Sequence, residues 1–427
     1  MQASPSRRKG RKEVLHDNIM GEVLSAQNMI RAYRTVLRNK GAAGVDGMTT
    51  SQLGAHLRKH WPSIQAKVAH GRYRPAPVKS VRIGKSGGGT RQLGIPTVLD
   101  RLIQQAVSQC LTHLFDPHMS SNSFGYRLGR SAHDAVRAAA GYVKEGKEWV
   151  VDIDISAFFD HVNHDILMHR LGQSIRDKAL LKLIGSYLRS DRQEGFQRIK
   201  RKAGTPQGGP LSPLLANIYL DKLDKELESR GLRFCRYADD LTIYVNSQRS
   251  AERVYESVTR WIGKHLKLTV NQDKSGSGRP WNRSFLGFQI KEDGEIAIAK
   301  QSLAKYKAHV RAKWSAKQSL TSSELVRNWR RYLLGWWGYF KLAKEVLGSL
   351  SAWTRRHVRK CFWQRWHSRR GRLRNLRMLG VTQEQIRRTN CYAGAWKAAR
   401  QPAMHKGLNN STLRRYGILT PDVLAAR

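Results

Sequence analysis

Hydrophobic and polar residues follow two patterns along this chain, one typical of strands and one typical of helices. Apolar and β-branched residues dominate 149–155, and short runs of the same kind on both sides of a tight turn predict a hairpin at 234–245. Apolar residues recur at helical spacing over 211–227, where Gly231 is a stop signal. The alternation of these elements predicts an α+β protein with a ferredoxin-like sheet. Further predicted elements are helices at 26–39, 164–171 and 251–266 and a strand at 268–271.

Acidic residues interrupt two of these strand patterns. Asp152 and Asp154 lie two residues apart in the strand at 149–155, so both side chains point to one face. Asp239 and Asp240 lie at the tip of the predicted hairpin. Adjacent carboxylates on rigid backbone suit a pair of Mg²⁺ ions, because hard cations prefer oxygen ligands. An Asp-Asp turn alone is more often a solvated turn, since aspartate favours turn geometry. A polar edge strand is likewise a plausible alternative for Asp152.

A loop rich in glycine and proline lies between the two acidic segments. It spans 204–213 and leads into the helix predicted at 211–227. Glycine allows a flat or bulky ligand to approach the backbone closely. The loop by itself is weak evidence of function. The order and spacing of the three segments together indicate one shared site.

With these motifs in this order, the chain resembles the reverse transcriptases encoded by bacterial group II introns, the intron maturases, over nearly its whole length. Residues 154–160 are similar to the first palm motif of that family, 204–212 to its template and nucleotide loop, and 237–240 to its second acidic motif. The resemblance implies a right-hand polymerase with fingers, a ferredoxin-like palm, an α-helical thumb and a small basic C-terminal segment. Further matches are 44–47, 124–127, 131–133, Asn271 with Lys274, and 285–288, which resembles the strand that closes the palm.

The resemblance also implies an order of regions along the chain. Residues 1–35 would form an N-terminal extension, 36–300 the fingers and palm, 301–370 the helical thumb or maturase domain, and 371–427 a DNA-binding segment. Family members that cut the second strand of a target carry a His- and Cys-rich endonuclease domain after that segment, and this sequence resembles the short class that lacks it. The four cysteines have no paired spacing, so they indicate neither a zinc site nor a disulfide framework.

The resemblance assigns the chemistry to the carboxylates. Asp154, Asp239 and Asp240 would be the catalytic residues and would hold two Mg²⁺ ions about 3.5–4 Å apart. The backbone carbonyl of Ile155 would complete the ligand shell. One ion would lower the pKa of a primer 3′-hydroxyl, and the other would hold the triphosphate and offset charge on the leaving pyrophosphate.

The incoming nucleotide would be held by residues from other segments. Lys85 and Arg91 lie on opposite arms of a predicted glycine-rich hairpin, so they can converge on its phosphates. A basic solvated loop is the alternative for both residues. In the family, a glutamine matching Gln207 braces the nucleotide, and Gly208 would allow its close approach.

An aromatic residue is expected beneath the sugar of that nucleotide. Phe159 lies five positions after Asp154, where the family places a ring that clashes with a ribose 2′-hydroxyl and admits deoxyribose. The neighbouring Phe158 is a candidate for the hydrophobic core. In this register the product of the reaction is DNA.

Charge changes the picture for the C-terminal third. The net charge of +45 predicts a polyanionic partner. Residues 301–427 hold 28 Lys and Arg against 4 Asp and Glu, together with eight of the twelve tryptophans. A solvated basic tail would lack the tryptophans, so helices with an aromatic core and a basic outer face are expected. The stretch 329–340 resembles the maturase-specific thumb. The expected contacts to duplex phosphates are Arg355, Arg356, Arg359 and Lys360.

These observations predict an RNA-directed DNA polymerase, a nucleotidyltransferase that binds its group II intron RNA, assists splicing and copies the intron into DNA for retrohoming. Its expected partners are that intron RNA, an RNA template with a DNA primer, target DNA and dNTP substrates. No apolar run approaches the roughly 20 residues of a membrane span, so no membrane partner is expected. The expected location is the bacterial cytoplasm, with nucleoid association when the protein engages DNA.

Two alternative functions remain open at this point. The first is a splicing-only maturase with a vestigial polymerase site, against which the intact Asp154, Asp239, Asp240 and Gln207 argue. The second is a reverse transcriptase recruited to host defence or repair, which is compatible with the same protein sequence. Intron RNA structure around the open reading frame would favour the intron-encoded function over the second alternative.

Overall fold

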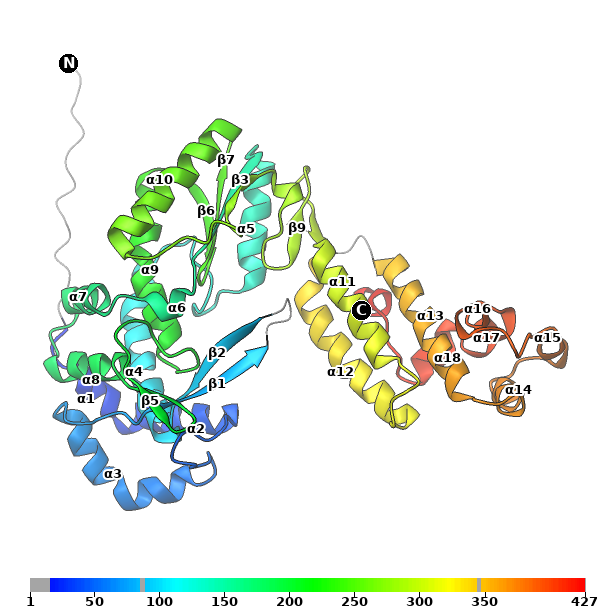
Figure 1. Cartoon of the computed structure of the whole chain (residues 1–427), viewed down its shortest axis with the longest axis horizontal. Coiled ribbons are helices and arrows are strands. Elements are labelled where there is room, and N and C mark those ends of the chain that lie inside the picture. The colour runs from blue at the N-terminus through cyan, green and yellow to red at the C-terminus, as the bar shows by residue number, and fades with distance from the viewer. Residues whose placement is uncertain (1–15, 85–88, 344–346, 427) are drawn as a thin grey trace. The chain divides into compact units, whose positions relative to one another are not determined.

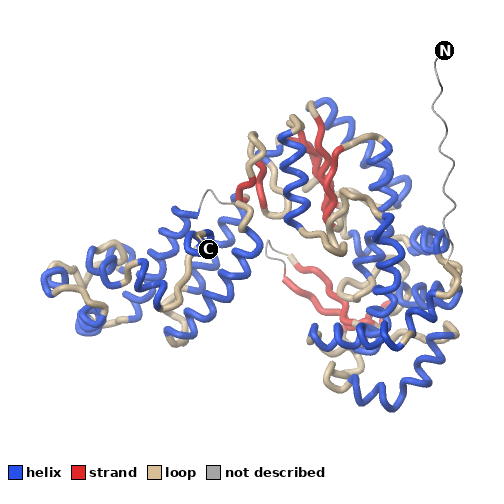
Figure 2. The backbone as a smooth tube through the Cα atoms, turned by 180° about the vertical axis from the view of Figure 1, so that it is seen from behind, coloured by secondary structure: helices blue, strands red, loops and turns tan. Residues whose placement is uncertain are grey.

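The structure, a computed structural model, describes residues 16–84, 89–343 and 347–426. It divides into two compact units (Figures 1 and 2). Unit 1 comprises Met1–Ala135 and Lys147–Gly278, and unit 2 comprises Val136–Gly146 and Arg279–Arg427. The region boundaries expected at residues 35, 300 and 370 are finer than this division and stay predictions.

The central sheet of unit 1 has the strand order β6-β7-β3-β8. Its strands are β3 (Trp149–Asp154), β6 (Arg233–Tyr237), β7 (Asp240–Val245) and β8 (Gly276–Gly278). Together with α9 (Ser212–Ser229) and α10 (Gln248–Leu266), they run along the chain as β3-α9-β6-β7-α10-β8, which is the β-α-β-β-α-β pattern of a ferredoxin-like fold. The predicted α+β class and palm alternation are therefore confirmed.

Helix α10 covers this sheet because its apolar residues recur on one face. Ala251, Val258, Ile262 and Leu266 are buried and follow one another at intervals of seven, four and four residues, while the remaining face is largely polar. The helix packs against β3 and β8. The hydrophobic core of unit 1 thus lies directly behind the strand that carries Asp154.

The prediction of a strand at 268–271 is wrong. Val270 forms an isolated bridge with Ile155, and the fourth strand of the sheet is β8, six residues further along the chain. β8 consists of glycine and serine and has no β-propensity of its own. It pairs with β3 because the central strand offers a free edge there, which is a tertiary cause.

The rest of unit 1 is a helical body with a second, four-stranded sheet of order β2-β1-β4-β5. Helix α2 (Ala26–Asn39) has the predicted bounds, and Ser25 caps its N-terminus by accepting a hydrogen bond from the Asn28 backbone nitrogen. The helices are α1 (Ile19–Leu24), α3 (Leu53–Ala69), α4 (Val98–Phe115), α6 (Phe158–His161), α7 (His164–Ser174) and α8 (Lys178–Leu188), with a 3₁₀ turn at Asp116–His118. The strands are β1 (Val78–Gly84), β2 (Thr90–Ile95), β4 (Arg192–Glu194) and β5 (Gln197–Ile199).

Unit 2 is mainly helical and has the aromatic core that the sequence predicts. Trp314, Trp329 and Trp363 are fully buried, and Trp329 lies edge-on to Tyr306 at 6.2 Å. Helix α12 begins with a capping box between Thr321 and Glu324. The helices are α11 (Lys300–Lys313), α12 (Ser322–Phe340), α13 (Leu347–Arg365), α14 (Arg369–Met378), α15 (Gln383–Arg387), α16 (Ala395–Ala398), α17 (Pro402–Gly407), α18 (Asn410–Arg415) and α19 (Pro421–Ala425), with a 3₁₀ turn at Pro280–Asn282.

The expectation that 285–288 closes the palm sheet is also wrong. Leu286 and Gly287 have φ values of +51° and +79°, so the chain turns there instead of extending. The strand β9 (Phe288–Ile290) begins after this turn and pairs with β10 (Ile296–Ile298) in a separate two-stranded sheet of unit 2.

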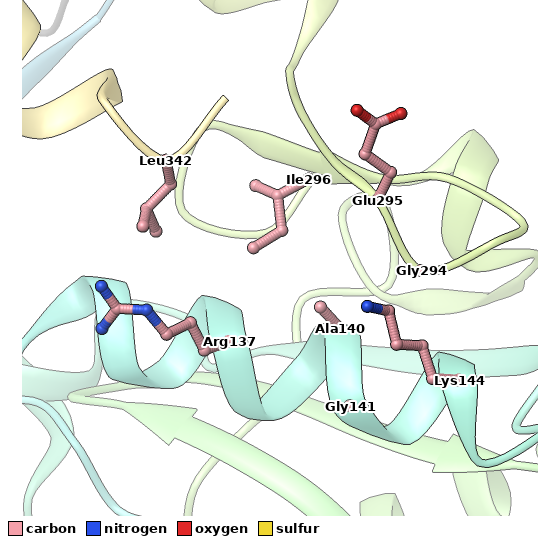
Figure 3. A pocket seen from close by; sticks show the side chains of 8 residues that line it. All are labelled: Arg137, Ala140, Gly141, Lys144, Gly294, Glu295, Ile296 and Leu342. Atoms are coloured by element: carbon pink, nitrogen blue, oxygen red, sulfur yellow. The ribbon is translucent and has the colours of Figure 1, made fainter. Parts of the chain in front are cut away.

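The β9–β10 hairpin lies over the part of α5 (Ala132–Lys144) that belongs to unit 2 (Figure 3). Gly294 in the hairpin loop has a φ of +77°, and a Cβ there would lie 2.4 Å from the Cγ of Lys144. Glycine is therefore needed for this close approach. A cavity of about 370 Å³ remains beside it, lined by Arg137, Ala140, Gly141, Lys144, Gly294, Glu295, Ile296 and Leu342. No helix among the described residues is both long and apolar enough to cross a membrane.

Candidate active site

The predicted hairpin places two carboxylates beside a third. Strands β6 and β7 are joined by Ala238 and Asp239 alone, because Tyr237 already pairs with Asp240. Ala238 has a φ of +59°, an uncommon conformation for a residue with a side chain. Asp240 pairs directly with Asp154 across β7 and β3. The three carboxylates therefore meet at one end of the sheet.

The negative charges of this cluster act on one another. Desolvation and the neighbouring Asp154 carboxylate raise the pKa of Asp239. Desolvation, Asp239 and Asp154 raise the pKa of Asp240 to about 6, and the nearby Lys274 opposes this shift. The Nζ of Lys274 lies 3.5 Å from an Asp154 carboxylate oxygen. The site thus gathers more negative charge than its own side chains neutralise, which favours cation binding.

The backbone after β3 leaves a carbonyl oxygen available. Asn271 donates its backbone N–H to the Asp154 carbonyl, and Ser156 donates its own to the Thr269 carbonyl. These two bonds flank Ile155 and do not use its carbonyl, which accepts no backbone hydrogen bond from the described residues around it. The Ser275 hydroxyl accepts a bond of 2.9 Å from the Asp154 backbone nitrogen and so fixes the strand end. This arrangement fits the role expected of the Ile155 carbonyl as a ligand.

A buried ion pair holds the turn that carries Asp239. Arg236 is 1% exposed and forms a two-pronged contact with Asp224 of α9, at 2.7 and 2.5 Å. The same guanidinium donates to the Ala238 carbonyl at 2.8 Å and to the side-chain oxygen of Asn217 at 2.9 Å. Because each of these groups is buried, the contacts fix the turn against α9. Arg236 was not predicted from the sequence, because its partners lie on other elements.

The segment around Gly125 packs closely against the same turn. A Cβ at Gly125 would lie 2.3 Å from the Ala238 backbone nitrogen, so only glycine fits between them. The Asn217 side chain donates to the Gly125 carbonyl at 2.8 Å. The next residue, Tyr126, is 53% exposed and has a φ of +58°. Burial and the charge of Asp239 raise the pKa of Tyr126, while Arg91 lowers it. Tyr126 therefore lies near both the acidic turn and β2, and is a site residue that the motif alone did not reveal.

A cavity of about 390 Å³ opens between β2 and the palm, and it contains two of the predicted nucleotide-binding residues. Arg91 and Gln207 both line it, together with Ala157. The other cations of the lining are engaged, since Arg82 pairs with Glu194 at 2.8 Å. The backbone of Arg91 pairs with Ile83 in the sheet, but its side chain makes no ion pair or hydrogen bond within the described residues, so the guanidinium is available to an anion. The complete lining is Arg82, Thr90, Arg91, Gln92, Ala157, Asp160, Arg192, Glu194 and Gln207.

The glycine loop before α9 is held in place by its backbone. The Gly94 backbone nitrogen donates to the Gln207 carbonyl at 2.6 Å, which joins the loop to the end of β2. Gly208 has a φ of +118°, and a Cβ there would lie 2.4 Å from the Gly94 carbonyl oxygen. On the other side, Thr205 donates its N–H to the Phe159 carbonyl at 2.7 Å. The loop therefore connects the sheet that contains β2 to the segment after Asp154, as the predicted site requires.

The two phenylalanines differ in burial. Phe158 is 2% exposed and belongs to the core, whereas Phe159 is partly buried and meets Phe158 edge-on at 5.2 Å. Phe159 does not line the cavity of Arg91, although Ala157 and Asp160 on either side of it do. Its role in sugar selection stays a prediction. Lys85, the other residue expected to bind phosphates, lies outside the described residues.

The expected row of duplex contacts on α13 needs correction. The Arg355 guanidinium pairs with Asp422 at 2.8 Å, and its side chain is 14% exposed. Arg359 is 5% exposed and donates to the Leu408 carbonyl at 3.0 Å. Both side chains contact later segments of the same protein, so they do not form an exposed basic stripe. Arg356 lies over the Trp396 ring at 5.3 Å, and Lys360 is partly exposed, so both stay predictions.

Within the described residues, no group of three or more His, Cys, Asp or Glu side chains is placed so that it could hold a metal ion. The residues nevertheless fit hard cations. The carboxylates of Asp154, Asp239 and Asp240 converge, desolvation and mutual repulsion raise the pKa of the last two, and the Ile155 carbonyl is free. Oxygen donors of this kind suit Mg²⁺.

Two family models match the chain. The model of reverse transcriptases (RNA-dependent DNA polymerases) matches residues 83–290, which include all three carboxylates. The model of the group II intron maturase-specific domain matches residues 303–379, which include most of α11 and all of α12 and α13.

Curated proteins with detectable similarity include Protein YkfC of Escherichia coli, which is 29% identical over 58% of this chain and 75% of its own length. The group II intron-encoded protein LtrA of Lactococcus lactis is 36% identical over 48% of this chain and 34% of its own length. The putative COX1/OXI3 intron 2 protein of Saccharomyces cerevisiae is 24% identical over 65% of this chain and 39% of its own length. The chain thus spans most of YkfC but well under half of the two intron proteins.

Solved structures also show similarity. A chain of a Cas6-RT-Cas1–Cas2 complex is 26% identical, with a TM-score of 0.37, over 57% of this chain and 42% of that one. Telomerase from Candida albicans, in complex with a fragment of telomeric RNA, is 15% identical, with a TM-score of 0.43, over 71% of this chain and 63% of that one.

Proposed function

We propose that the chain is a reverse transcriptase of the group II intron type, in which a polymerase domain precedes a maturase-specific domain, and that it copies RNA into DNA at Asp154, Asp239 and Asp240. The two family models support the family and enzyme class predicted from the sequence, and the fold class is confirmed. The observation that carries the assignment of the site is the direct pairing of Asp154 with Asp240, with Asp239 at the tip of the same hairpin.

Polymerases of this family generally use divalent metal ions. We assign two Mg²⁺ ions to Asp154, Asp239, Asp240 and the Ile155 carbonyl, because these groups supply the oxygen donors and the uncompensated negative charge. When bound, such ions lower the pKa of a primer 3′-hydroxyl and offset charge on the departing pyrophosphate. The protein's own contribution is to hold the carboxylates rigidly, through Arg236 and the bonds around Ser275.

The incoming dNTP is placed in the cavity beside the palm. Arg91 supplies an unpaired cation for its phosphates, and Gln207, which lines the same cavity, braces it. Gly208 has no side chain, so the nucleotide can approach the backbone closely there. Phe159 does not line this cavity but lies between Ala157 and Asp160, which do, and we propose that its ring limits the space beneath the sugar, so that a 2′-hydroxyl is excluded and the product is DNA.

The maturase-specific domain and its charge support a larger role. Residues 301–427 carry 28 Lys and Arg against 4 Asp and Glu, which suits phosphate-rich partners. Relatives such as LtrA are named as group II intron-encoded proteins. We therefore propose that the protein binds its group II intron RNA, assists its splicing, and copies it from a primer at target DNA during retrohoming. Within this proposal it acts in the bacterial cytoplasm and on the nucleoid.

The proposal is tested by Asp239→Asn in a primer-extension assay. The substitution keeps the size of the side chain but replaces one carboxylate oxygen with an amide NH2 and removes the negative charge, so extension should fall by roughly 10²- to 10³-fold or more, as for loss of one key electrostatic contact. Binding of intron RNA should stay within about threefold of the wild type, because phosphate contacts come from basic surfaces. Asp152→Asn is the matched control, because Asp152 lies on β3 two residues before Asp154 but outside the cluster. Extension near the wild-type rate in Asp239→Asn would refute the assignment of the site.

A further inference from the structure

Arg359 combines burial with unused hydrogen-bonding capacity. It lies in α13 and is 5% exposed, and its Nε donates to the Leu408 carbonyl at 3.0 Å. Within the described residues, its two terminal nitrogens make no hydrogen bond and its guanidinium forms no ion pair. Arg359 lines a cavity of about 440 Å³, together with His405, Asn409, Asn410 and Ser411.

The surroundings make this unpaired charge costly. Other well-buried arginines of the chain have acidic partners, Arg236 with Asp224 and Arg355 with Asp422. The lining of the Arg359 cavity contains no acidic residue. Burial and the positive charges of Arg355 and Arg356 lower the pKa of Arg359 to about 10, so the guanidinium remains charged at neutral pH. A buried cation without a counter-charge is unfavourable, and an anion that enters the cavity relieves that cost.

The rim of the cavity is suited to oxygen acceptors. His405 and Asn410 are exposed and carry polar side chains, whereas the hydroxyl of the exposed Ser411 already donates to the side-chain oxygen of Asn409 at 2.6 Å. Asn409 is occupied, because its side chain accepts from the Thr412 nitrogen at 2.8 Å and donates to the Lys406 carbonyl at 3.0 Å. The lining offers no tryptophan, tyrosine or phenylalanine on which a base could stack. The cavity is therefore matched to a phosphate rather than to a whole nucleotide.

We propose that the cavity over Arg359 binds a single phosphate group of a nucleic-acid backbone, with the guanidinium at its base as a two-pronged donor. The large excess of positive charge in residues 301–427 favours a polynucleotide over free phosphate as the source of that group. The inference rests on the nucleic-acid binding of the proposed function, but not on its polymerase chemistry. It replaces the expected exposed row of arginines on α13 with one buried contact.

The first test compares Arg359→Gln with Arg369→Gln in the full-length protein. Arg369 is exposed and lies in the same unit, so the two variants lose the same charge. Binding to an RNA template paired with a DNA primer is measured by fluorescence anisotropy between 50 and 200 mM salt. Arg359→Gln should weaken binding roughly tenfold and flatten the salt slope by about 0.9, the value for one lost phosphate contact. Arg369→Gln should change binding less than threefold. Equal effects in both variants would overturn the proposal.

The second test identifies the source of the phosphate. Neutral methylphosphonate linkages are placed one at a time along the DNA primer. At one position the substitution should weaken the wild type roughly tenfold, but should not weaken Arg359→Gln further, because the contact is already lost. If inorganic phosphate raises the melting temperature of the wild type while no primer position shows this coupling, the site takes free phosphate and the backbone proposal is overturned.

A third variant guards against misfolding. Ser411→Glu places a carboxylate on the exposed rim, where it can pair with Arg359 and occupy the cavity. It should reproduce the loss of binding without unfolding the protein, whereas Gln383→Glu, an exposed residue outside the cavity, should not. Wild-type binding in Ser411→Glu would overturn the proposal. Single-nucleotide addition at saturating primer should be unchanged in Ser411→Glu, so its failure is distinct from loss of the Asp239 chemistry.

Discussion

Replacing Arg236 with methionine is expected to loosen the turn that carries Asp239. The guanidinium makes five hydrogen bonds in the structure, two to Asp224 and one each to Asn217, Ala238 and Ser123. Methionine fills a similar volume but donates none of them. The variant therefore leaves a fully buried carboxylate without its partner and the Ala238 carbonyl without its donor.

The magnitude follows from the burial of the pair. Removing one partner of a buried ion pair costs about 3–5 kcal/mol, mostly because the remaining charge is uncompensated. Arg236 and Asp224 are 1% and 0% exposed, so little solvent screening reduces this value. A displacement of the turn by about 1 Å would in addition lower the extension rate roughly 10²-fold.

Cys235 provides a local probe for the first effect. Its thiol is buried beside Arg236, so alkylation requires the sheet to open. A loss of about 3–5 kcal/mol corresponds to alkylation that is faster by roughly 10²- to 10⁴-fold, which peptide mass spectrometry can follow. Arg233→Met, at the exposed start of the same strand, is the matched control.

A double variant separates stability from positioning. Arg236→Met combined with Asp224→Leu leaves no charge behind, so the alkylation rate of Cys235 should return most of the way to that of the wild type. Primer extension should stay low, because the Ala238 carbonyl still lacks its donor. Wild-type extension in the double variant, or wild-type alkylation in Arg236→Met, would refute the positioning role.

Two further substitutions test the nucleotide cavity. Phe159→Ala should reduce the preference for dNTPs over rNTPs by roughly 10- to 200-fold in competitive primer extension, since the wall against the 2′-hydroxyl is removed. Phe158→Ala should instead destabilise the core by about 3–5 kcal/mol without changing the preference, and the reverse result would shift the register by one residue. Gly208→Ala should raise the KM for dNTPs about tenfold, because the new methyl group would lie 2.4 Å from the Gly94 carbonyl oxygen. Gly195→Ala has a similarly positive φ but open surroundings, so an equal effect there would exclude the steric explanation.

The elements that carry the site were predictable because their signals are local. The hairpin at 234–245, the strand at 149–155 and helix α2 depend on residues that are neighbours in sequence. Strand β8 was missed because glycine and serine gain strand structure only by pairing with β3. The turn at Leu286 and Gly287 ended a segment that otherwise has an extended, apolar pattern.

The positions of charged side chains were the least predictable feature. Arg355 and Arg359 have the spacing of an exposed basic face, yet their burial depends on Asp422 and Leu408, which lie about 50 to 70 residues further along the chain. Arg236 gave no sequence signal of a buried pair for the same reason, since its partner lies on another element. The sequence alone does not distinguish an arginine that faces water from one that pairs with an aspartate or lines a cavity.

By itself, the sequence predicted the family, the class of chemistry and the three carboxylates, because the acidic motifs occur in the order and at the spacing that the family resemblance implies. The tertiary structure decided which cations are free. Arg91 remains unpaired in the nucleotide cavity, Arg236 is committed to the catalytic turn, and Arg359 is buried beneath an open pocket. The physical reason is that burial and partnering are properties of contacts between distant segments, and those contacts exist only once the chain has folded.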